Sequence, residues 1–223
     1  MYKNDSVEIR GIREVRGKGV SSPRFCTRAA ARRWELNMNK EFWKPGNMLY
    51  PLPAVMVGCK GRDGKNNIIT VAWTGTVCTN PAMVYISLRK IRHSYGIIKD
   101  SGEFTINLTN ESLVRAADYC GVKSGKDVDK FKEMKLTPVK GVYVDAPCIG
   151  EAPVNIECKL KEIIPLGSHD MFLAEVLGVH ADSRYMNEKG KFDLNQAKPV
   201  VYSHGEYYGL GELMGTFGYS VKK

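Results

Sequence analysis

The sequence lacks the patterns that mark several common classes of protein. None of its apolar runs approaches the ~18 residues that a membrane-spanning helix requires. It contains no Cys-X-X-Cys pair, and its six cysteines and four histidines are too dispersed for zinc-ligand spacing. No Gly-X-Gly-X-X-Gly fingerprint occurs, which argues against a Rossmann crevice. No Ser/His/Asp or Cys/His arrangement for nucleophilic catalysis is recognisable either. We therefore expect no membrane span, no metal site and no catalytic triad.

An apolar export signal is also missing from the first residues of the chain. Four acidic residues among the first 37 argue against a mitochondrial transit peptide, which is typically poor in acids. We expect a cytoplasmic protein whose scattered cysteines are reduced, buried thiols.

The positive charge of the chain is concentrated in its first sixth. The net charge is +9, and residues 1–37 hold nine basic and four acidic side chains, which leaves +4 for the rest. A basic arm that binds an anionic partner such as nucleic acid is one interpretation. The preferred interpretation is an extension outside the core, with only 29–34 resembling a helix. We expect the folded domain at residues 38–223, without a nucleic-acid or membrane partner.

The remaining 38–223 segment has the composition and patterning of a β-rich globular domain. Apolar residues make up 43% and charged residues 26% of the chain, close to globular averages. An Asp-Gly pair at 63–64 predicts a turn between the first two strands. A helix is expected at 110–119, with Asn110 as its N-cap and Gly121 beyond its end. A second helix is expected at 94–100, ended by Ser101-Gly102, and a short third one at 128–134. Strands are expected at 53–60, 67–77, 83–88, 103–108, 154–161, 171–179 and 199–202.

The order of these elements predicts the fold class. Strands and helices do not alternate strictly, so a doubly wound parallel sheet does not fit. The pattern favours a mainly β protein with helical insertions, built as an antiparallel barrel. In 154–161, alternation predicts a half-buried strand with Val154, Ile156 and Cys158 inward and Asn155 and Glu157 outward.

Two neighbouring segments carry the strongest signals for a binding site. Residues 87–94 place basic side chains and Ser94 between a strand and a helix start, where free N–H groups favour a phosphate. An exposed basic turn with Ser94 as N-cap is the alternative. Residues 70–76 place threonines and Gly75 beside Trp73, which suits a flat heteroaromatic ligand. A Thr-rich edge strand is the alternative there.

From Leu52 to about Gly218 the chain resembles the flavin reductase-like family, with its FMN-binding split barrel, in the flavoredoxin and ferric-reductase branch. The order and spacing of several segments carry the resemblance. They are Asn67-Ile-Ile-Thr-Val-Ala-Trp-Thr-Gly-Thr76, Asn80-Pro81, Ser87-Leu-Arg-Lys-Ile-Arg-His-Ser94, Ile98-Lys-Asp-Ser-Gly-Glu-Phe-Thr-Ile-Asn-Leu108, Ser124-Gly125 with Asp129-Lys130-Phe131, Glu151-Ala-Pro-Val154, His169-Asp-Met-Phe172 and Gly205-Glu-Tyr-Tyr-Gly-Leu-Gly211.

The resemblance implies a Greek-key split barrel that forms a homodimer and binds one non-covalent FMN per subunit near the interface. Lys130 is a weaker counterpart of the family's site residues. Tyr207 and Tyr208 either close a partner's pocket or pack the C-terminal strand, and packing is the preferred interpretation. His169 either faces the nicotinamide side of the flavin, as the one catalytic candidate, or is a hydrogen-bonded turn residue. The cofactor-binding candidates are Thr70, Val71, Ala72, Trp73, Thr74, Gly75, Thr76, Ser87, Leu88, Arg89, Arg92, His93, Ser94 and Asn107.

Three functions remain open at this point. The first is an NAD(P)H-dependent flavin or ferric reductase, in which a hydride passes from the nicotinamide to the flavin and electrons then pass to free flavin, ferric iron or a redox protein. The second is a flavoredoxin-type electron carrier without its own NAD(P)H oxidation. The third is an anion- or nucleic-acid-binding barrel that uses the basic tail.

Overall fold

The structure is a computed structural model that describes residues 39–221. The chain divides into two units, Met1–Met48 and Leu49–Lys223, and every helix and strand given below lies in the second. The expected tail 1–37, its helix-like stretch 29–34, Cys26 and the expected domain boundary at residue 38 fall outside the described residues. They stay predictions.

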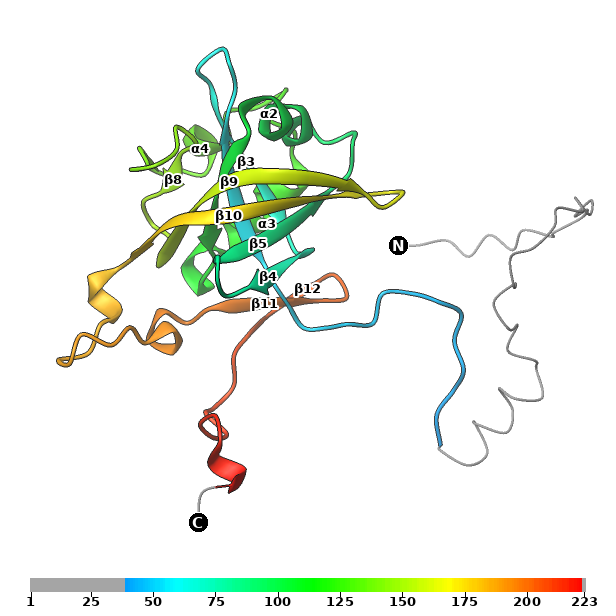
Figure 1. The fold of residues 1–223 in the computed structure, drawn as a ribbon, viewed down its shortest axis with the longest axis vertical. Helices are drawn as coiled ribbons and strands as arrows, with labels where there is room; N and C mark the ends of the chain where they lie inside the picture. The colour runs from blue at the N-terminus through cyan, green and yellow to red at the C-terminus, as the bar shows by residue number, and fades with distance from the viewer. Residues whose placement is uncertain (1–38, 222–223) are drawn as a thin grey trace, which may run out of the picture. The chain divides into compact units, whose positions relative to one another are not determined.

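The second unit is organised around one antiparallel sheet of seven strands, in the order β3-β2-β6-β9-β10-β5-β4 (Figure 1). Every neighbouring pair is antiparallel. The predicted fold class, a mainly β antiparallel split barrel with helical insertions, is confirmed. The strands are β2 (Val55–Lys60), β3 (Asn66–Val71), β4 (Thr74–Cys78), β5 (Met83–Leu88), β6 (Glu103–Leu108), β9 (Val154–Pro165) and β10 (Asp170–Ala181).

The sheet closes into a barrel at Ala72 and Trp73. The prediction of one strand over 67–77 is wrong, because these two residues separate β3 from β4, and those strands occupy opposite edges of the sheet. The bend is held by Thr74 N–H, which donates to Ala72 O at 3.0 Å, and by Ser87 N–H, which donates to Trp73 O at 2.8 Å. Neither bond has a signal in the local sequence, where β-forming residues continue on both sides.

Short elements complete the unit. A three-stranded sheet contains β1 (Leu52–Pro53), β11 (Val200–Ser203) and β12 (Glu206–Gly209), and β7 (Pro138–Val139) pairs with β8 (Cys148–Ile149). Of these strands, the sequence predicted only β11 and Pro53, the last residue of β1. The helices are α2 (His93–Ser101), α3 (Val114–Val122) and α4 (Lys130–Glu133), with 3-10 turns η1 (Glu111–Leu113), η2 (Ser183–Tyr185), η3 (Leu194–Ala197) and η4 (Tyr219–Val221).

The helix ends test the capping predictions. Gly102 ends α2 as expected, with φ 69° and its N–H bonded to Ile98 O. Asn110 occupies the N-cap position of η1, which leads into α3, but its side chain makes no capping hydrogen bond. It accepts from Ser112 Oγ, and Asn110 forms a β-bridge with Pro199. Gly121 lies inside α3 and not beyond its end. Tertiary pairing of Asn110 thus overrides its local capping preference.

The core consists of two apolar clusters separated by the sheet. Alternate residues of β2 face opposite ways, so Val57 lies in the barrel interior while Met56 lies between the sheet and α3. Because both faces of β2 are covered, its apolar residues run continuously. Gly58 is required there, since a Cβ would lie 2.1 Å from Pro147 O. The barrel interior includes Ile86, Phe104, Ile106 and Phe172; the outer cluster includes Ile68, Leu113, Ala117 and Phe131.

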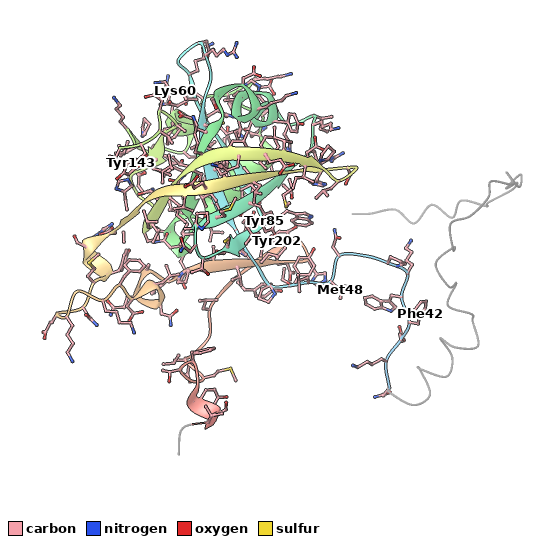
Figure 2. All side chains as sticks on the ribbon, viewed as in Figure 1. Phe42, Met48, Lys60, Tyr85, Tyr143 and Tyr202 are labelled. Carbon is pink, nitrogen blue, oxygen red and sulfur yellow. The ribbon has the colours of Figure 1, made fainter. Side chains whose placement is uncertain are left out.

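Glu157 lies on the outer face of β9 as the alternation predicts, but it is not exposed there. Its side chain is fully buried beneath the loop 141–144. The carboxylate accepts hydrogen bonds from the N–H groups of Val142, Tyr143 and Val144 at 2.7–2.9 Å, and it pairs with His180 Nε2 at 2.5 Å. Tyr143 in turn packs over β10 at Gly178 (Figure 2). The strand pattern could not show that this loop returns over the outer face of β9.

The surroundings of Glu157 determine its ionisation. Burial by itself would raise the pKa of Glu157, but the hydrogen bonds from His180 and three backbone N–H groups outweigh burial and hold the pKa below its ordinary value. The folded state therefore favours the carboxylate.

The described residues 39–221 include five of the six cysteines. Cys59, Cys78, Cys120, Cys148 and Cys158 are free thiols, and all but Cys78 are buried. Burial raises the pKa of Cys59, Cys120 and Cys148 to about 11. No group of three His, Cys, Asp or Glu side chains in this range could hold a metal ion. No helix in this part of the chain is long and apolar enough to cross a membrane.

Replacing Glu157 by Gln is expected to lower the free energy of unfolding by about 2–4 kcal/mol at neutral pH, because a Gln amide cannot accept all the bonds that the loop donates. A depressed pKa stabilises the fold above the ordinary carboxyl value and loses that contribution as the pH falls through the folded pKa. The difference between the wild-type protein and E157Q should thus shrink in acid, as measured by urea unfolding across pH.

Glu175 provides the matched control for this experiment. It lies on β10 and pairs at 3.1 Å with Lys161 near the surface, so E175Q is expected to change stability by less than about 1 kcal/mol. Equal losses for the two variants would contradict the structural role of Glu157.

Candidate functional site

A cleft of about 230 Å³ opens where the barrel closes. Its lining comes from β3, the Ala72–Trp73 bend, the end of β5, α3 and the residue before β10. Nine of the predicted site residues line it: Thr70, Val71, Ala72, Trp73, Ser87, Leu88, Arg89, Arg92 and His169. Four further lining residues were not among the predicted site residues: Ala54, Ile69, Gly121 and Tyr202.

One end of the cleft is cationic. Arg89 and Arg92 lie in the turn that joins β5 to α2, and Arg92 N–H donates to Arg89 O at 3.0 Å to close this turn. Arg92 Nη2 donates to Gly121 O at 3.0 Å, in the last turn of α3. Neither guanidinium has a carboxylate partner among residues 39–221. Two arginines without a counter-ion at a cleft suit an anionic group.

The other end of the cleft is aromatic. The rings of Trp73 and His169 are nearly parallel, at 12° with centroids 6.3 Å apart. Tyr202 lies 6.5 Å from Trp73, and Tyr207 lies 5.8 Å from Tyr202. Tyr202 is part of β11 (Figure 2). This grouping offers a flat ligand ring an apolar wall.

His169 and Tyr207 each carry a polar group beside the aromatic wall. The His169 Nδ1 atom and Ser168 Oγ lie within hydrogen-bond distance, at 3.0 Å. Tyr207 Oη donates to Asp118 Oδ1 at 3.4 Å. Burial, followed by the charge and hydrogen bond of Asp118, raises the pKa of Tyr207 to about 12, so its hydroxyl stays protonated. Tyr207 packs against Tyr202 and also lines the cleft, whereas Tyr208 is exposed and bonds to Glu206.

Residues of β4 in the predicted set do not line the cleft. Thr74 is buried, and its Oγ1 donates to Tyr85 O at 2.6 Å. Gly75 packs against the Tyr85 ring, where a Cβ would lie 3.0 Å from the ring. Thr76 is exposed. The chain has crossed to the other edge of the sheet by this point, so these residues no longer follow Thr70 and Val71.

Ser94 and Asn107 are committed to internal hydrogen bonds. Ser94 is 2% exposed, and its Oγ accepts from Asn67 Nδ2 at 2.8 Å. Asn107 is fully buried: its amide donates to Met56 O at 2.8 Å, and its carbonyl accepts from Ile149 N–H and Asn155 Nδ2. Both side chains hold the fold together and lie outside the cleft.

His93 lines a different hollow, of about 760 Å³, together with Arg62 and Lys126. Burial, and then the charges of Lys126 and Lys130, lower the pKa of His93. Although this hollow is larger, its charged lining mixes both signs, including Asp63, Asp127 and Asp129. Its lining has no tryptophan or tyrosine. The smaller cleft combines an aromatic wall with unpaired cations, and it is the better candidate for a flat anionic ligand.

Three side chains satisfy the carbonyl groups at the C-terminal end of α3. Thr70 Oγ1 donates to Ala117 O, Arg92 donates to Gly121 O, and Lys130 Nζ donates to Cys120 O at 2.8 Å and to Ile68 O at 2.7 Å. Burial lowers the pKa of Lys130. The carbonyls of Cys120 and Gly121 lie in the last turn of α3, where carbonyls lack i+4 partners within the helix and cations are favourable. Lys130 therefore fixes α3 against β3 and does not line the cleft itself.

Residues 48–211 match the family model of the flavin reductase like domain. The flavoredoxin of Desulfovibrio vulgaris (Miyazaki F) is 37% identical, with a TM-score of 0.77 over 82% of this chain and 100% of that chain. The flavoredoxin from Methanosarcina acetivorans is 27% identical, with a TM-score of 0.73 and the same coverage.

A sequence relative from Archaeoglobus fulgidus is 29% identical over 161 residues, which is 72% of this chain and 88% of the relative. The matched family model spans most of the unit Leu49–Lys223 and all the residues of the cleft. The chain belongs to the flavin reductase-like family.

Proposed function

We propose that this chain is an FMN-binding oxidoreductase that takes a hydride from NAD(P)H and delivers electrons to free flavin, ferric iron or a redox protein. The observation that carries the proposal is that two guanidinium groups without a carboxylate partner among the described residues, Arg89 and Arg92, lie at one end of a cleft whose other end is aromatic. FMN would match this arrangement, because its aromatic ring system is joined to an anionic phosphate. The names of the two flavoredoxin structures support a flavin ligand, and the FMN-binding protein from Thermus thermophilus, 20% identical, shares the fold.

The residues present fit FMN by the chemistry of their donors. Arg89 and Arg92 offer forked N–H donors to a phosphate. The phosphate role predicted for Ser94 and His93, and the contact predicted for Asn107, are left out of this proposal, because those side chains lie elsewhere. Trp73, Leu88 and Tyr202 supply apolar surface beside the ring and exclude water from it.

The chemistry supplied by bound FMN is hydride acceptance from a nicotinamide and electron transfer in steps of one or two. The residues of the chain would bind FMN and orient it. Arg89 and Arg92 hold the phosphate end, and Trp73 limits the tilt of the ring. His169 is oriented by Ser168 through Nδ1, so Nε2 is the ring nitrogen left to exchange a hydrogen bond at the cleft.

We also propose that the working unit is a homodimer with the flavin near its interface. The cleft volume of about 230 Å³ is below the roughly 300–1,000 Å³ typical of sites for molecules of this size. A second copy that covers the open side would complete the site. This proposal agrees with the dimer that the family resemblance implies.

A second candidate is an electron carrier of the flavoredoxin type, which another protein reduces. The names of the two flavoredoxin structures, at 37% and 27% identity, favour it. Both candidates require bound flavin, so they differ only in whether a nicotinamide reduces this protein directly.

Replacing Arg89 and Arg92 by Ala, singly, is expected to weaken FMN binding on the order of tenfold to a hundredfold, because each change removes charge-assisted hydrogen bonds to the phosphate. Riboflavin lacks the phosphate and should bind with nearly unchanged affinity. Quenching of flavin fluorescence during titration of the apoprotein measures both dissociation constants.

Arg62 supplies the control for these variants, because it lines the 760 Å³ hollow and not the cleft. R62A should leave both affinities unchanged. If R62A weakened FMN and R89A and R92A did not, the phosphate would bind in the larger hollow. Trp73→Ala should weaken FMN and riboflavin alike, since the ring is common to both.

Anaerobic addition of NADH or NADPH to the flavin-loaded protein is expected to bleach the flavin absorbance near 450 nm. Stopped-flow absorbance measures the rate and shows which nicotinamide is used. Bleaching by dithionite but by neither nicotinamide would reject the reductase proposal and leave the carrier.

A further inference from the structure

A buried carboxylate lies next to the cleft and belongs to none of the groups discussed above. Asp170 is the first residue of β10 and follows His169 directly. It is 2% exposed. Its Oδ2 accepts a hydrogen bond from Tyr95 Oη at 2.6 Å and lies 3.6 Å from Lys90 Nζ. Its Oδ1 is buried without a hydrogen-bond partner.

The half-satisfied state of Asp170 indicates a role other than stability. A buried carboxylate with one unpaired oxygen is unfavourable relative to an apolar side chain of similar size. Both of its partners belong to one segment: Lys90 lies in the turn 89–92, and Tyr95 lies in the first turn of α2. The carboxylate thus connects β10 to both ends of the turn that carries Arg89 and Arg92.

Asp170 pairs with only one of the three cations in this turn. Arg89, Lys90 and Arg92 are close in sequence, and the predicted cofactor site included the two arginines but not Lys90. In the structure, the two arginines line the cleft, whereas Lys90 pairs with Asp170. The ion pair holds the ammonium group of Lys90 at Asp170, although the rest of this side chain is exposed.

Tyr95 holds the other end of the turn. Its N–H donates to Arg92 O at 3.0 Å, and its ring packs edge-on against Phe172 at 5.1 Å. The hydrogen bond to Asp170, followed by burial and the carboxylate charge, raises the pKa of Tyr95, so its hydroxyl remains a donor. Asp170 itself is fixed by strand pairing, because β10 aligns Asp170 with Leu88 and Met171 with Ser87.

We propose that Asp170 is a positioning residue that holds the turn 89–92, through Lys90 and Tyr95, with Arg89 and Arg92 directed at the anionic group of the ligand. Because Asp170 follows His169, the same residue ties the cationic end of the cleft to its aromatic end. The inference rests on the proposed flavin site for the identity of the ligand. The bracing of the turn itself is independent of that identity.

The test compares three variants of the full-length protein. Tyr95→Phe removes only the hydroxyl and keeps the ring against Phe172. Lys90→Met removes the ion pair, and Asp170→Asn removes the charge that Lys90 faces. Tyr143→Phe is the matched control, because Tyr143 is exposed in the loop beneath which Glu157 is buried.

Two measurements are made on each variant. Hydrogen–deuterium exchange without ligand is expected to rise on the order of tenfold at the amides of residues 89–92 in Tyr95→Phe and Asp170→Asn, with no change in β6. Fluorescence titration is expected to give a loss of FMN affinity on the order of tenfold, with riboflavin affinity changed by less than about twofold.

The outcomes separate this inference from the proposed function. Unchanged exchange at 89–92 in Tyr95→Phe and Asp170→Asn would overturn the bracing role. Equal weakening of FMN and riboflavin would also overturn it, because a general loss of structure affects both ligands. If the wild-type protein binds neither flavin, the proposed function fails, and the exchange measurement alone then decides whether Asp170 holds the turn.

Discussion

The closure of the barrel at Ala72 and Trp73 is the constraint on which the rest of the structure depends. Two residues carry the chain from one edge of a seven-stranded sheet to the other, and the bond from Ser87 N–H to Trp73 O joins the bend to β5. Strands β3 and β4 remain the two edge strands of the sheet, and the bend connects them directly. Because the passage is so short, Trp73 is placed beside the end of β5, and the cleft forms at the same point.

The cleft combines residues that are far apart in sequence, and rigid elements hold each of them. Pairing of β10 with β5 sets His169 and Asp170 against the end of β5. Helix α3 presents carbonyl groups that Thr70, Arg92 and Lys130 satisfy, so the outer wall is fixed by hydrogen bonds as well as by apolar contacts. The flavin chemistry proposed for this family member needs such a rigid holder more than it needs an acid or a base.

The distribution of charge follows from the same arrangement. Residues 38–223 have a net charge of only +4, since residues 1–37 account for +5 of the net +9. Within the barrel, Lys90 is neutralised by Asp170, and Lys130 is directed at backbone carbonyls. Arg89 and Arg92 are thereby left as the cations available to a ligand in the cleft. The proposed phosphate site would give these two arginines a local role in binding one anionic ligand.

The sequence by itself determined the fold class, most strand positions and nine of the residues that line the cleft, because local alternation, turn residues and spaced motifs are properties of neighbouring residues. It also placed Arg89 and Arg92 in a turn before a helix. Only the tertiary structure decided that 67–77 is two strands, that Glu157 is buried, and that Ser94 and Asn107 point inward. Each of these depends on a bond to a distant segment: Ser87 with Trp73, the loop 141–144 with Glu157, Asn67 with Ser94. Tyr202 joins the cleft for the same reason, since long-range pairing and burial leave no periodic signal in the residues around it.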